Sequence, residues 1–480
     1  MVGVMGRGNE TIYRARYVLI DGCFEQEAAL VERAGRIEEI LLDDEAARAV
    51  NASRRQVDLG NVALIPGQLN VHSHAFQRSL RGKTEYGQPG REDDNFWTWR
   101  TEMYELANRI EPDEMEIIGR MVFLEMLCAG ITHVGEFHYI HHRPDGSAYD
   151  DPNELALRLG RAAKDVGLRM TMLPVAYHTG DIGEAAGPDQ RRFISSGVHT
   201  FLGRVEGLAH RWADEELLDV GVAPHSIRAV DRQWLEAIAE WGRSRKAPVH
   251  IHACEQRKEV RASEYAFGMP PVEALYEWGV LDERWTIIHG THLSDRELEI
   301  LEEVRPTIGA CPTTERNLGD GFLPATELVA RDVPIALGSD SHTVVDPFEE
   351  MRLVEYHERL RREERNVLVG ADRLGRTSTA EILWPMGTRF GARSLAGDDG
   401  AIRVGGPADF VALDLDHPSI AGAQRSTLLT DVVLSMSAAA VRDVIVAGKA
   451  VVAEGVHRRE HEIISDYCAL MERYSQEGWR

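Results

Sequence analysis

The sequence predicts an α/β fold, a (β/α)8 barrel (TIM barrel) with a small β-sandwich-like domain formed by the N- and C-terminal segments. Two observations favour this architecture. Between residues 61 and 395, eight apolar strand candidates alternate with amphipathic helical stretches, which suits a closed barrel better than an open sheet. Both ends of the chain consist instead of short β-rich runs separated by Gly- and Pro-containing turns.

The two ends of the chain share a pattern of strands and turns. The first segment, residues 1–60, contains the apolar runs RYVLIDG and EAALVERAGRIEEILL. The last segment, residues 396–480, contains AIRVGGPADFVALDLD and VRDVIVAGKAVVAEG, followed by a terminal helix. Because the middle of the chain lacks this pattern, we expect the two ends to pair into one small β domain beside the barrel.

The barrel segment, residues 61–395, contains the eight strand candidates. In chain order they are ALIPGQLNVHSH, ITHVGEFHY, LRMTMLPVAY, LLDVGVAPHS, APVHIHACE, RWTIIHGTH, RPTIGACPTT and VPIALGSDSH. Helical stretches lie between most of them, and one of these has Pro112 near its start and Gly130 just past its end, as is typical of helix termini. The chain has no short-period repeat, which excludes a solenoid.

Composition restricts the classes of partner. The 480 residues are 43% hydrophobic and 28% charged, as expected for a globular protein with a large core. The formal net charge of −24 argues against nucleic acid or an anionic membrane as the main partner, so an anionic substrate would need a local cationic pocket. There is no run of 18 apolar residues, so we expect no membrane span. The N-terminal residues lack the apolar stretch of a secretory signal. The five cysteines are scattered without C-x-x-C spacing, which fits a reducing cytoplasm rather than a disulfide scaffold.

Histidines and one aspartate follow several of the predicted strands. His72 and His74 end the first strand, His252 the fifth, His289 the sixth and Asp340 the eighth. In a barrel of this class the carboxyl ends of the strands meet at one mouth, so these side chains should converge. A single His-x-His pair occurs readily by chance, but Zn²⁺ and Fe²⁺ bind imidazole and carboxylate together. The set therefore predicts a metal site held by His72, His74, His252 and Asp340.

Glu255 lies three residues after His252, just past the fifth strand. A carboxylate beside a metal can take a proton from water and pass it to a leaving nitrogen. An isolated glutamate here would instead be a solvated side chain at the start of a helix. The neighbouring metal ligands favour the acid/base role.

Four motifs resemble those of the amidohydrolase superfamily, in its mononuclear deaminase branch: NVHSH, HIHACE, IIHGTH and GSDSH. The binuclear branches carry a bridging carboxylated lysine on the fourth strand, and the corresponding stretch here, DVGVAPHS, has no lysine. The resemblance therefore implies one divalent metal per chain. It also disfavours ring-opening hydrolases of the dihydropyrimidinase type.

A second group of motifs is similar to those of the formimidoylglutamate deiminases, enzymes of histidine degradation. These motifs are HSHAFQR, DNFWTWR, EFHYIHH, APHSIRAV, HACEQRKEV and ACPTTERNLGDG. The resemblance covers nearly the whole chain. It implies hydrolysis of the dicarboxylate N-formimidoyl-L-glutamate to N-formyl-L-glutamate and ammonia by a homodimer.

The same resemblance implies a role for each candidate residue. The metal would be zinc, with iron as the alternative. Glu255 and His289 would manage the proton transfers, and Asp340 would accept a further proton as ammonia leaves. Residues matching substrate-contacting positions of the family are Gln77, Tyr139, His225 and Arg228, and Arg100 is the candidate for the second carboxylate. Trp97 and Trp99 are expected to pack around the mouth of the site.

Two alternatives remain open at this point. One is a deaminase of the same branch that acts on guanine, another aromatic amidine or an s-triazine, although HSIRAV favours an acyclic dianion. The other is a non-catalytic scaffold that retains the barrel for assembly. A scaffold predicts that metal ligands are lost, whereas here every predicted ligand is present, and a metal analysis separates the two.

Overall fold

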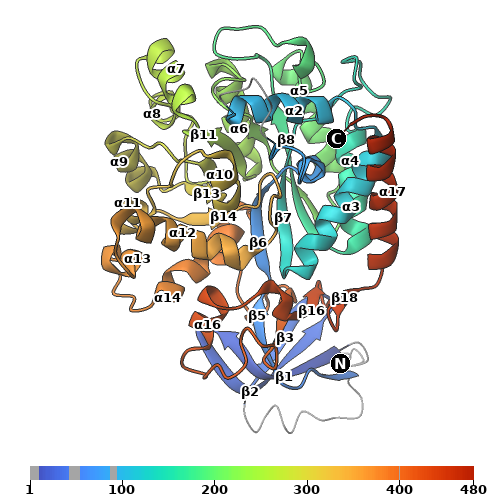
Figure 1. Cartoon of the computed structure of the whole chain (residues 1–480), viewed down its shortest axis with the longest axis vertical. Coiled ribbons are helices and arrows are strands. Elements are labelled where there is room, and N and C mark those ends of the chain that lie inside the picture. Colours follow the sequence, from blue (N-terminus) through green and yellow to red (C-terminus); the bar gives the residue numbers. More distant parts are fainter. Residues whose placement is uncertain (1–9, 43–54, 87–93, 399, 480) are drawn as a thin grey trace, which may run out of the picture.

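The computed structural model describes residues 10–42, 55–86, 94–398 and 400–479. The start of the predicted N-terminal segment, residues 1–9, lies outside the described residues. The chain forms a (β/α)8 barrel with a sheet made from both of its ends below it (Figure 1). The predicted fold class is confirmed.

Eight positions around the barrel are filled by parallel strands. In order these are β6 (Gln68–Ser73), β7 (Ile131–His138), β8 (Arg169–Ala176), β9 (Leu218–Val220) with β10 (Ala223–Pro224), β11 (Val249–Ala253), β12 (Trp285–His289), β13 (Thr307–Ala310) and β14 (Ile335–Leu337). Regular pairing gives two half-barrels, and parallel bridges from Ser73 to Asp340 and from Val222 to Val249 join them. Every residue of β7 is buried, as expected for a parallel strand covered on both faces.

Helices surround the strands and follow them in the chain. The longer ones are α3 (Pro112–Cys128), α4 (Glu154–Val166), α5 (Val198–Arg211), α6 (Arg232–Arg245), α7 (Arg257–Phe267), α9 (Asp295–Val304) and α12 (Pro347–Arg362). Helix α3 begins at Pro112 as predicted, and the backbone N–H of Glu111 before it donates to the side chain of Glu114. Gly130, two residues past its end, has a φ of +86°, which glycine adopts at little cost.

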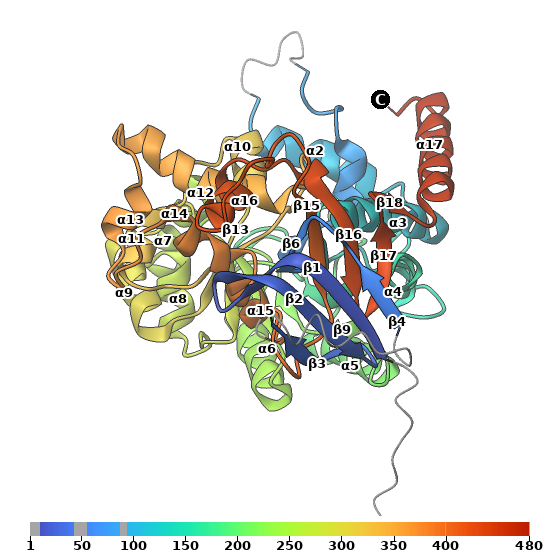
Figure 2. The same cartoon turned by 90° about the horizontal axis from the view of Figure 1, so that it is seen from below.

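Both chain ends contribute to one sheet of nine strands. Its strands are β1 (Glu10–Ile20), β2 (Cys23–Arg33), β3 (Arg36–Leu41), β4 (Arg55–Asp58), β5 (Val62–Pro66), β15 (Phe410–Asp414), β16 (Val441–Val446), β17 (Lys449–Ala453) and β18 (Val456–His457). Seen from below, strands of both ends lie together across this end of the molecule (Figure 2). A bridge from Arg36 to Pro407 brings the β3 edge back to the segment before β15. The sheet therefore curls around a core of its own, in which the rings of Tyr13 and Phe410 lie 5.1 Å apart.

Strand β5 differs from the expectation. We placed the whole stretch ALIPGQLNVHSH in the barrel, but β5 pairs with β1 and β15 of the terminal sheet, and the barrel strand β6 starts only at Gln68. Gly67 separates the two strands, and a Cβ there would overlap the side chain of Thr132. An apolar run does not reveal which sheet its backbone joins. The proposed boundaries at residues 60 and 395 therefore stay a prediction.

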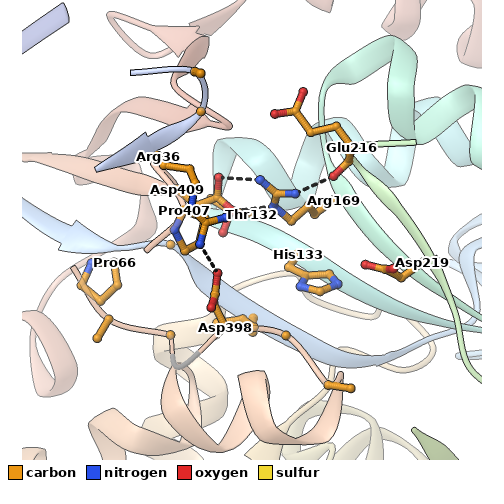
Figure 3. Close-up of a pocket in the computed structure, with 18 residues that line it drawn as sticks. Arg36, Pro66, Thr132, His133, Arg169, Glu216, Asp219, Asp398, Pro407 and Asp409 are labelled. Carbon is orange, nitrogen blue, oxygen red and sulfur yellow. Dashed lines mark hydrogen bonds and ion pairs between the residues drawn. The ribbon is translucent and has the colours of Figure 1, made fainter. Parts of the chain in front are cut away.

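The junction between the barrel and the terminal sheet encloses a polar cavity (Figure 3). Arg169, at the start of β8, pairs with Asp409 of the sheet segment at 2.6 Å and donates to the carbonyl of Glu216. Arg36 pairs with Asp398 at 3.3 Å. These charged groups neutralise one another across the amino ends of the strands, where barrels of this kind carry stabilising rather than catalytic residues.

The terminal helix α17 (Glu460–Gln476) packs along α3 (Figure 1). Tyr474 donates to Glu114 at 2.7 Å, and Tyr467 donates to Ser79 at 3.2 Å. Within the described ranges, none of the helices is both long and apolar enough to cross a bilayer.

Candidate active site

The predicted metal ligands come from three barrel strands that are far apart in the sequence. His72 lies in β6 and His74 directly follows it, His252 lies in β11, and Asp340 comes three residues after β14. All four side chains are buried at the carboxyl ends of their strands. Folding thus brings residues separated by up to 268 positions to one point, as the barrel prediction required.

The distances between their ligand atoms fit a single divalent ion. The Nε2 atoms of His72 and His252 are 3.1 Å apart, and Asp340 Oδ1 lies 3.5 Å from Nε2 of His72 and 3.4 Å from Nε2 of His74. Tetrahedral zinc with ligands at roughly 2.0–2.1 Å holds them about 3.3 Å from one another. Two nitrogens this close also need a shared cation or proton between them. The residues therefore fit a metal ion.

Two of the three imidazole rings, those of His74 and His252, are oriented by backbone carbonyls. Nδ1 of His74 lies 2.8 Å from the carbonyl of Phe137, and Nδ1 of His252 lies 3.1 Å from the carbonyl of His225. A carbonyl accepts a proton only, so Nδ1 carries the hydrogen and Nε2 presents its lone pair to the centre. Burial lowers the pKa of His72 to about 3 and also lowers the pKa of His74 and His252. Neutral imidazole is the form that binds a metal.

Backbone contacts hold Asp340 against β6. The N–H of Asp340 donates to the carbonyl of His72 at 3.0 Å, and the N–H of His74 donates to the carbonyl of Asp340 at 3.1 Å. Gly338 allows this approach, because a Cβ there would meet the Cβ of His72 at 2.7 Å. Burial alone would raise the pKa of Asp340, but the hydrogen bond with His72 and the nearby imidazoles hold it below its usual range. Asp340 is thus an ionised carboxylate.

Glu255 and His289 face each other beside this cluster. Glu255 Oε1 lies 3.7 Å from His289 Nε2, which is 3.9 Å from Asp340 Oδ2. Burial raises the pKa of Glu255 to about 7. Burial opposes charge on His289, but Glu255, Glu315 and Asp340 outweigh it and raise its pKa to about 10. A carboxyl group that titrates near neutral pH can both take and give a proton, as a general acid and base must.

Glu315 orients His289 from the other side. Its Oε1 lies 3.3 Å from His289 Nδ1 and accepts from the backbone N–H of Cys311 at 2.9 Å. The sequence alone assigns no role to Glu315, which lies within the motif ACPTTERNLGDG. Its position after β13, the seventh strand, was a usable signal, since residues there reach the same mouth.

A cavity opens beside the cluster and contains every predicted substrate residue. It is lined by His74, Gln77, Phe96, Trp99, Arg100, Met103, Tyr104, Tyr139, Tyr177, His225, Arg228, His252, Glu255, His289, Leu318 and Asp340. Helix α2 (Phe96–Ala107) contributes five of these residues and lies across the end of the barrel opposite the sheet (Figure 1). The prediction did not include Tyr104 or Tyr177.

Arg228 is buried and pairs with Glu259, its Nε lying 3.4 Å from Oε1 of that carboxylate. Neither Nη atom of Arg228 is hydrogen-bonded to a residue that the structure describes. Glu259 Oε2 also accepts from the backbone N–H of Glu255 at 3.2 Å. One edge of the guanidinium is therefore held by a neighbouring carboxylate, while the group still lines the cavity.

Gln77 and Tyr139 form a second polar group in the cavity. Gln77 Nε2 donates to the hydroxyl of Tyr139 at 3.0 Å, while Gln77 Oε1 is buried without a hydrogen-bond partner in the described part of the chain. The ring of His225 lies 5.9 Å from that of Tyr139. An unsatisfied buried amide oxygen next to the cluster is available to a ligand that carries N–H groups.

Arg100 lies on the same face of α2 as Trp97 and Tyr104. Its guanidinium is 4.4 Å from the centre of the Trp97 ring and 5.5 Å from that of Tyr104. Lys258 lies 4.2 Å and Arg228 5.9 Å from the centre of the same indole. Trp97 thus does more than pack, because it gathers three cations at the mouth of the cavity.

A model of the amidohydrolase family matches residues 63–451, which is most of the chain. The chain belongs to the amidohydrolase family. Members of this family use a divalent metal, and the described residues include buried groups of His and Asp side chains close enough together to hold one, such as His72, His74 and Asp340.

Known relatives narrow the position of this amidohydrolase within the family. It is 39% identical over 454 residues to formimidoylglutamate deiminase of Pseudomonas aeruginosa, covering 94% of this chain and 96% of that protein. It is 26% identical over 451 residues to 5-methylthioadenosine/S-adenosylhomocysteine deaminase of Shouchella clausii, covering 91% and 89% of the two chains. The crystal structure of an amidohydrolase from Brucella melitensis superposes with a TM-score of 0.87 at 32% identity, covering 96% of this chain and 99% of that one. These similarities indicate a hydrolase that acts on C–N bonds.

Proposed function

We propose that this amidohydrolase hydrolyses N-formimidoyl-L-glutamate to N-formyl-L-glutamate and ammonia. One observation carries the proposal. Two arginines, Arg228 and Arg100, line the same small cavity as the proposed metal ligands and the Glu255–His289 pair. An acyclic amidine attached to two carboxylates needs these groups together. The 39% identity to formimidoylglutamate deiminase of Pseudomonas aeruginosa supports it independently.

The metal ion would be held by His72, His74, His252 and Asp340. Zinc binds imidazole nitrogens together with carboxylate oxygens, and iron(II) also accepts these donors. When bound, such an ion polarises water and the amidine, which makes attack possible near neutral pH. We propose zinc as the resident metal and iron as the alternative.

Glu255 is the proton carrier of the proposed reaction. It takes a proton from the water whose oxygen attacks the amidine carbon, and then delivers that proton to the terminal nitrogen. The pKa of Glu255, raised to about 7 by burial, suits both transfers. His289, held by Glu315, donates a hydrogen bond to the reacting atoms. The amidine group of the substrate is protonated at neutral pH, so the proton from Glu255 turns its terminal nitrogen into an ammonium leaving group. Asp340 accepts the second proton, from the attacking oxygen, as the C–N bond breaks and ammonia leaves.

Arg228 would bind the α-carboxylate of the substrate. The ion pair between its Nε and Glu259 leaves the two Nη atoms for a bidentate contact with the substrate carboxylate. Gln77 and Tyr139 add hydrogen bonds, and His225 closes the wall of the cavity beside them. Arg100 would bind the second carboxylate from α2.

We further propose that the enzyme is a homodimer and acts in the cytoplasm. The resemblance to the formimidoylglutamate deiminases supports the dimer. The five cysteines are all free thiols, which supports a reducing compartment.

The proposed function is tested by ammonia release from N-formimidoyl-L-glutamate, N-formimidoyl-glycine and guanine. We expect rapid release from the first, slow release from the second, which lacks one carboxylate, and none from guanine. Preference for guanine would instead identify a purine deaminase. Release from none of them by metal-replete protein would support the scaffold alternative.

A further inference from the structure

Two tyrosines that we did not predict lie together in the wall of the cavity. Tyr104 projects from α2, and Tyr177 directly follows β8, so both reach the mouth of the barrel. Their hydroxyl oxygens are 3.5 Å apart. Tyr177 is almost completely buried, and its ring lies 4.6 Å from that of His225.

Gln190 determines which way these hydroxyls can donate. Its Oε1 accepts from the backbone N–H of Gly187 at 2.8 Å, which fixes the orientation of the amide. The Nε2 group therefore faces the tyrosines, donating to Tyr177 at 2.9 Å, while Tyr104 at 3.3 Å and the carbonyl of Gly180 at 3.4 Å are further acceptors within reach. An amide nitrogen cannot accept a hydrogen bond, so neither tyrosine can donate to Gln190.

The two hydroxyl protons consequently lack sufficient acceptors. One tyrosine can donate to the oxygen of the other across 3.5 Å. Among the residues that the structure describes, the second hydroxyl then has no acceptor, although its oxygen already receives a bond from Gln190. Tyr104 is partly exposed, whereas Tyr177 is buried. When Tyr104 donates to Tyr177, the buried Tyr177 proton is left without an acceptor, which is costly unless a ligand supplies one.

The charges around Tyr177 indicate what kind of ligand that is. Burial raises the pKa of Tyr177 above its ordinary value, so the phenol stays a neutral donor, while Arg228 and Arg100 both act to lower it. Tyr177, Arg228 and Arg100 also line the same cavity. A neutral donor among cations suits an anionic oxygen.

We propose that Tyr177 and Tyr104 donate hydrogen bonds to the γ-carboxylate of the substrate, with Gln190 as the positioning residue that directs their protons into the cavity. The inference rests on the proposed function. The α-carboxylate is attached to the carbon that bears the amidine and suits Arg228, which connects through Glu259 to Glu255. The γ-carboxylate extends further, and Tyr104 lies one helical turn from Arg100 on α2.

The test uses three substrates and full-length, metal-replete enzyme. They are N-formimidoyl-L-glutamate, N-formimidoyl-γ-aminobutyrate, which keeps only the γ-carboxylate, and N-formimidoyl-L-2-aminobutyrate, which keeps only the α-carboxylate. Tyr177→Phe should lower kcat/KM about 10- to 100-fold for the first two, mainly through KM, because a hydrogen bond to a charged group is lost. For the third substrate it should change kcat/KM less than about threefold.

Gln190→Glu tests the positioning role. Its carboxylate can still accept from Gly187, but it would also accept the tyrosine proton and turn that proton away from the substrate. We expect the same substrate-selective loss as in Tyr177→Phe. Tyr467→Phe removes a buried hydroxyl on α17, outside the cavity lining, and should change none of the three values.

The outcomes separate the two proposals. If wild-type enzyme releases no ammonia from N-formimidoyl-L-glutamate, the proposed function fails and this inference fails with it. If wild type is active but Tyr177→Phe is unchanged, or is impaired equally on all three substrates, only the inference is overturned. If Tyr177→Phe behaves as expected and Gln190→Glu matches wild type, the role of Gln190 is overturned.

Discussion

At the scale of single residues, the surroundings of Glu255 suit it for proton transfer. It is buried, faces His289 at 3.7 Å, and has a pKa raised to about 7. A buried carboxyl group that titrates near neutral pH can take up and release a proton, whereas an exposed glutamate stays ionised at that pH.

Glu255→Gln should therefore abolish most activity while leaving the fold and the metal intact. We expect kcat to fall at least about 10²-fold, the usual scale for removal of a general acid and base. Glu264→Gln, an exposed position on α7, is the matched control and should keep full activity. Steady-state kinetics with parallel elemental analysis provides the measurement. A metal-replete Glu255→Gln enzyme with wild-type turnover would refute the assignment.

Arg228→Met should lower kcat/KM for N-formimidoyl-L-glutamate by roughly 30-fold to several thousand-fold. This follows from a loss of about 2–5 kcal/mol when a charge-assisted pair is truncated, at about 1.4 kcal/mol for each factor of ten. Because the variant also leaves Glu259 buried without its partner, some loss of stability is expected as well.

Arg228→Lys separates these two effects. It keeps a cation beside Glu259 and should preserve stability, but an ammonium cannot reproduce the planar fork, so little activity should return. Wild type and Arg228→Met should handle N-formimidoyl-γ-aminobutyrate about equally poorly. If the mutation harms this truncated substrate as much as the full one, Arg228 has a structural role only.

At the scale of elements, the sequence predicted the strands better than their partners. Apolar runs located all eight barrel strands, because buried parallel strands need them. The same rule misassigned Val62–Pro66, since burial does not distinguish the barrel from the terminal sheet. The metal ligands could be predicted because they lie on or just after strand ends. Tyr177 and Glu259 could not be assigned roles, because those roles depend on contacts between elements, such as the 3.4 Å between Arg228 and Glu259.

The junction of the two sheets gives a prediction at this scale. Arg169→Met breaks the largely buried pair with Asp409 that joins β8 to the terminal sheet (Figure 3). We expect the free energy of unfolding to fall by about 1–3 kcal/mol, because a buried charge loses its partner, with little change in kcat. Arg33→Met, which removes a more exposed pair with Glu38, should cost less than about 1 kcal/mol. Urea denaturation compares the two, and equal losses would contradict the proposed importance of the junction.

At the scale of the whole molecule, the net charge of the protein is negative, and the proposed substrate is also an anion. The formal net charge is −24, yet Arg100, Arg228 and Lys258 gather around Trp97 at the mouth of the cavity. Local forked contacts can outweigh a diffuse repulsive field at physiological ionic strength, because that field is screened within about 8 Å. The barrel makes this possible by collecting residues from many strands at one end.

The purified enzyme should contain one divalent metal ion per chain. The four proposed ligands lie close together, and the fourth strand has no lysine to bridge a second ion. His72→Ala should lose the metal. His133 is a buried histidine near the amino end of β7, away from the site, and His133→Ala should keep the metal. Elemental analysis measures both. Two ions per chain, or full activity without any, would rule out a mononuclear site.

The most direct test of the central claim follows the amidine carbon itself. N-formimidoyl-L-glutamate labelled with ¹³C at that carbon is incubated with metal-replete enzyme and observed by NMR. The proposed reaction cleaves the bond to the terminal nitrogen, so the label should appear as N-formyl-L-glutamate with one equivalent of ammonia. Label in formamide with free glutamate would mean that the other C–N bond is cleaved, and an unchanged signal would mean that this substrate is not hydrolysed; either result contradicts the account.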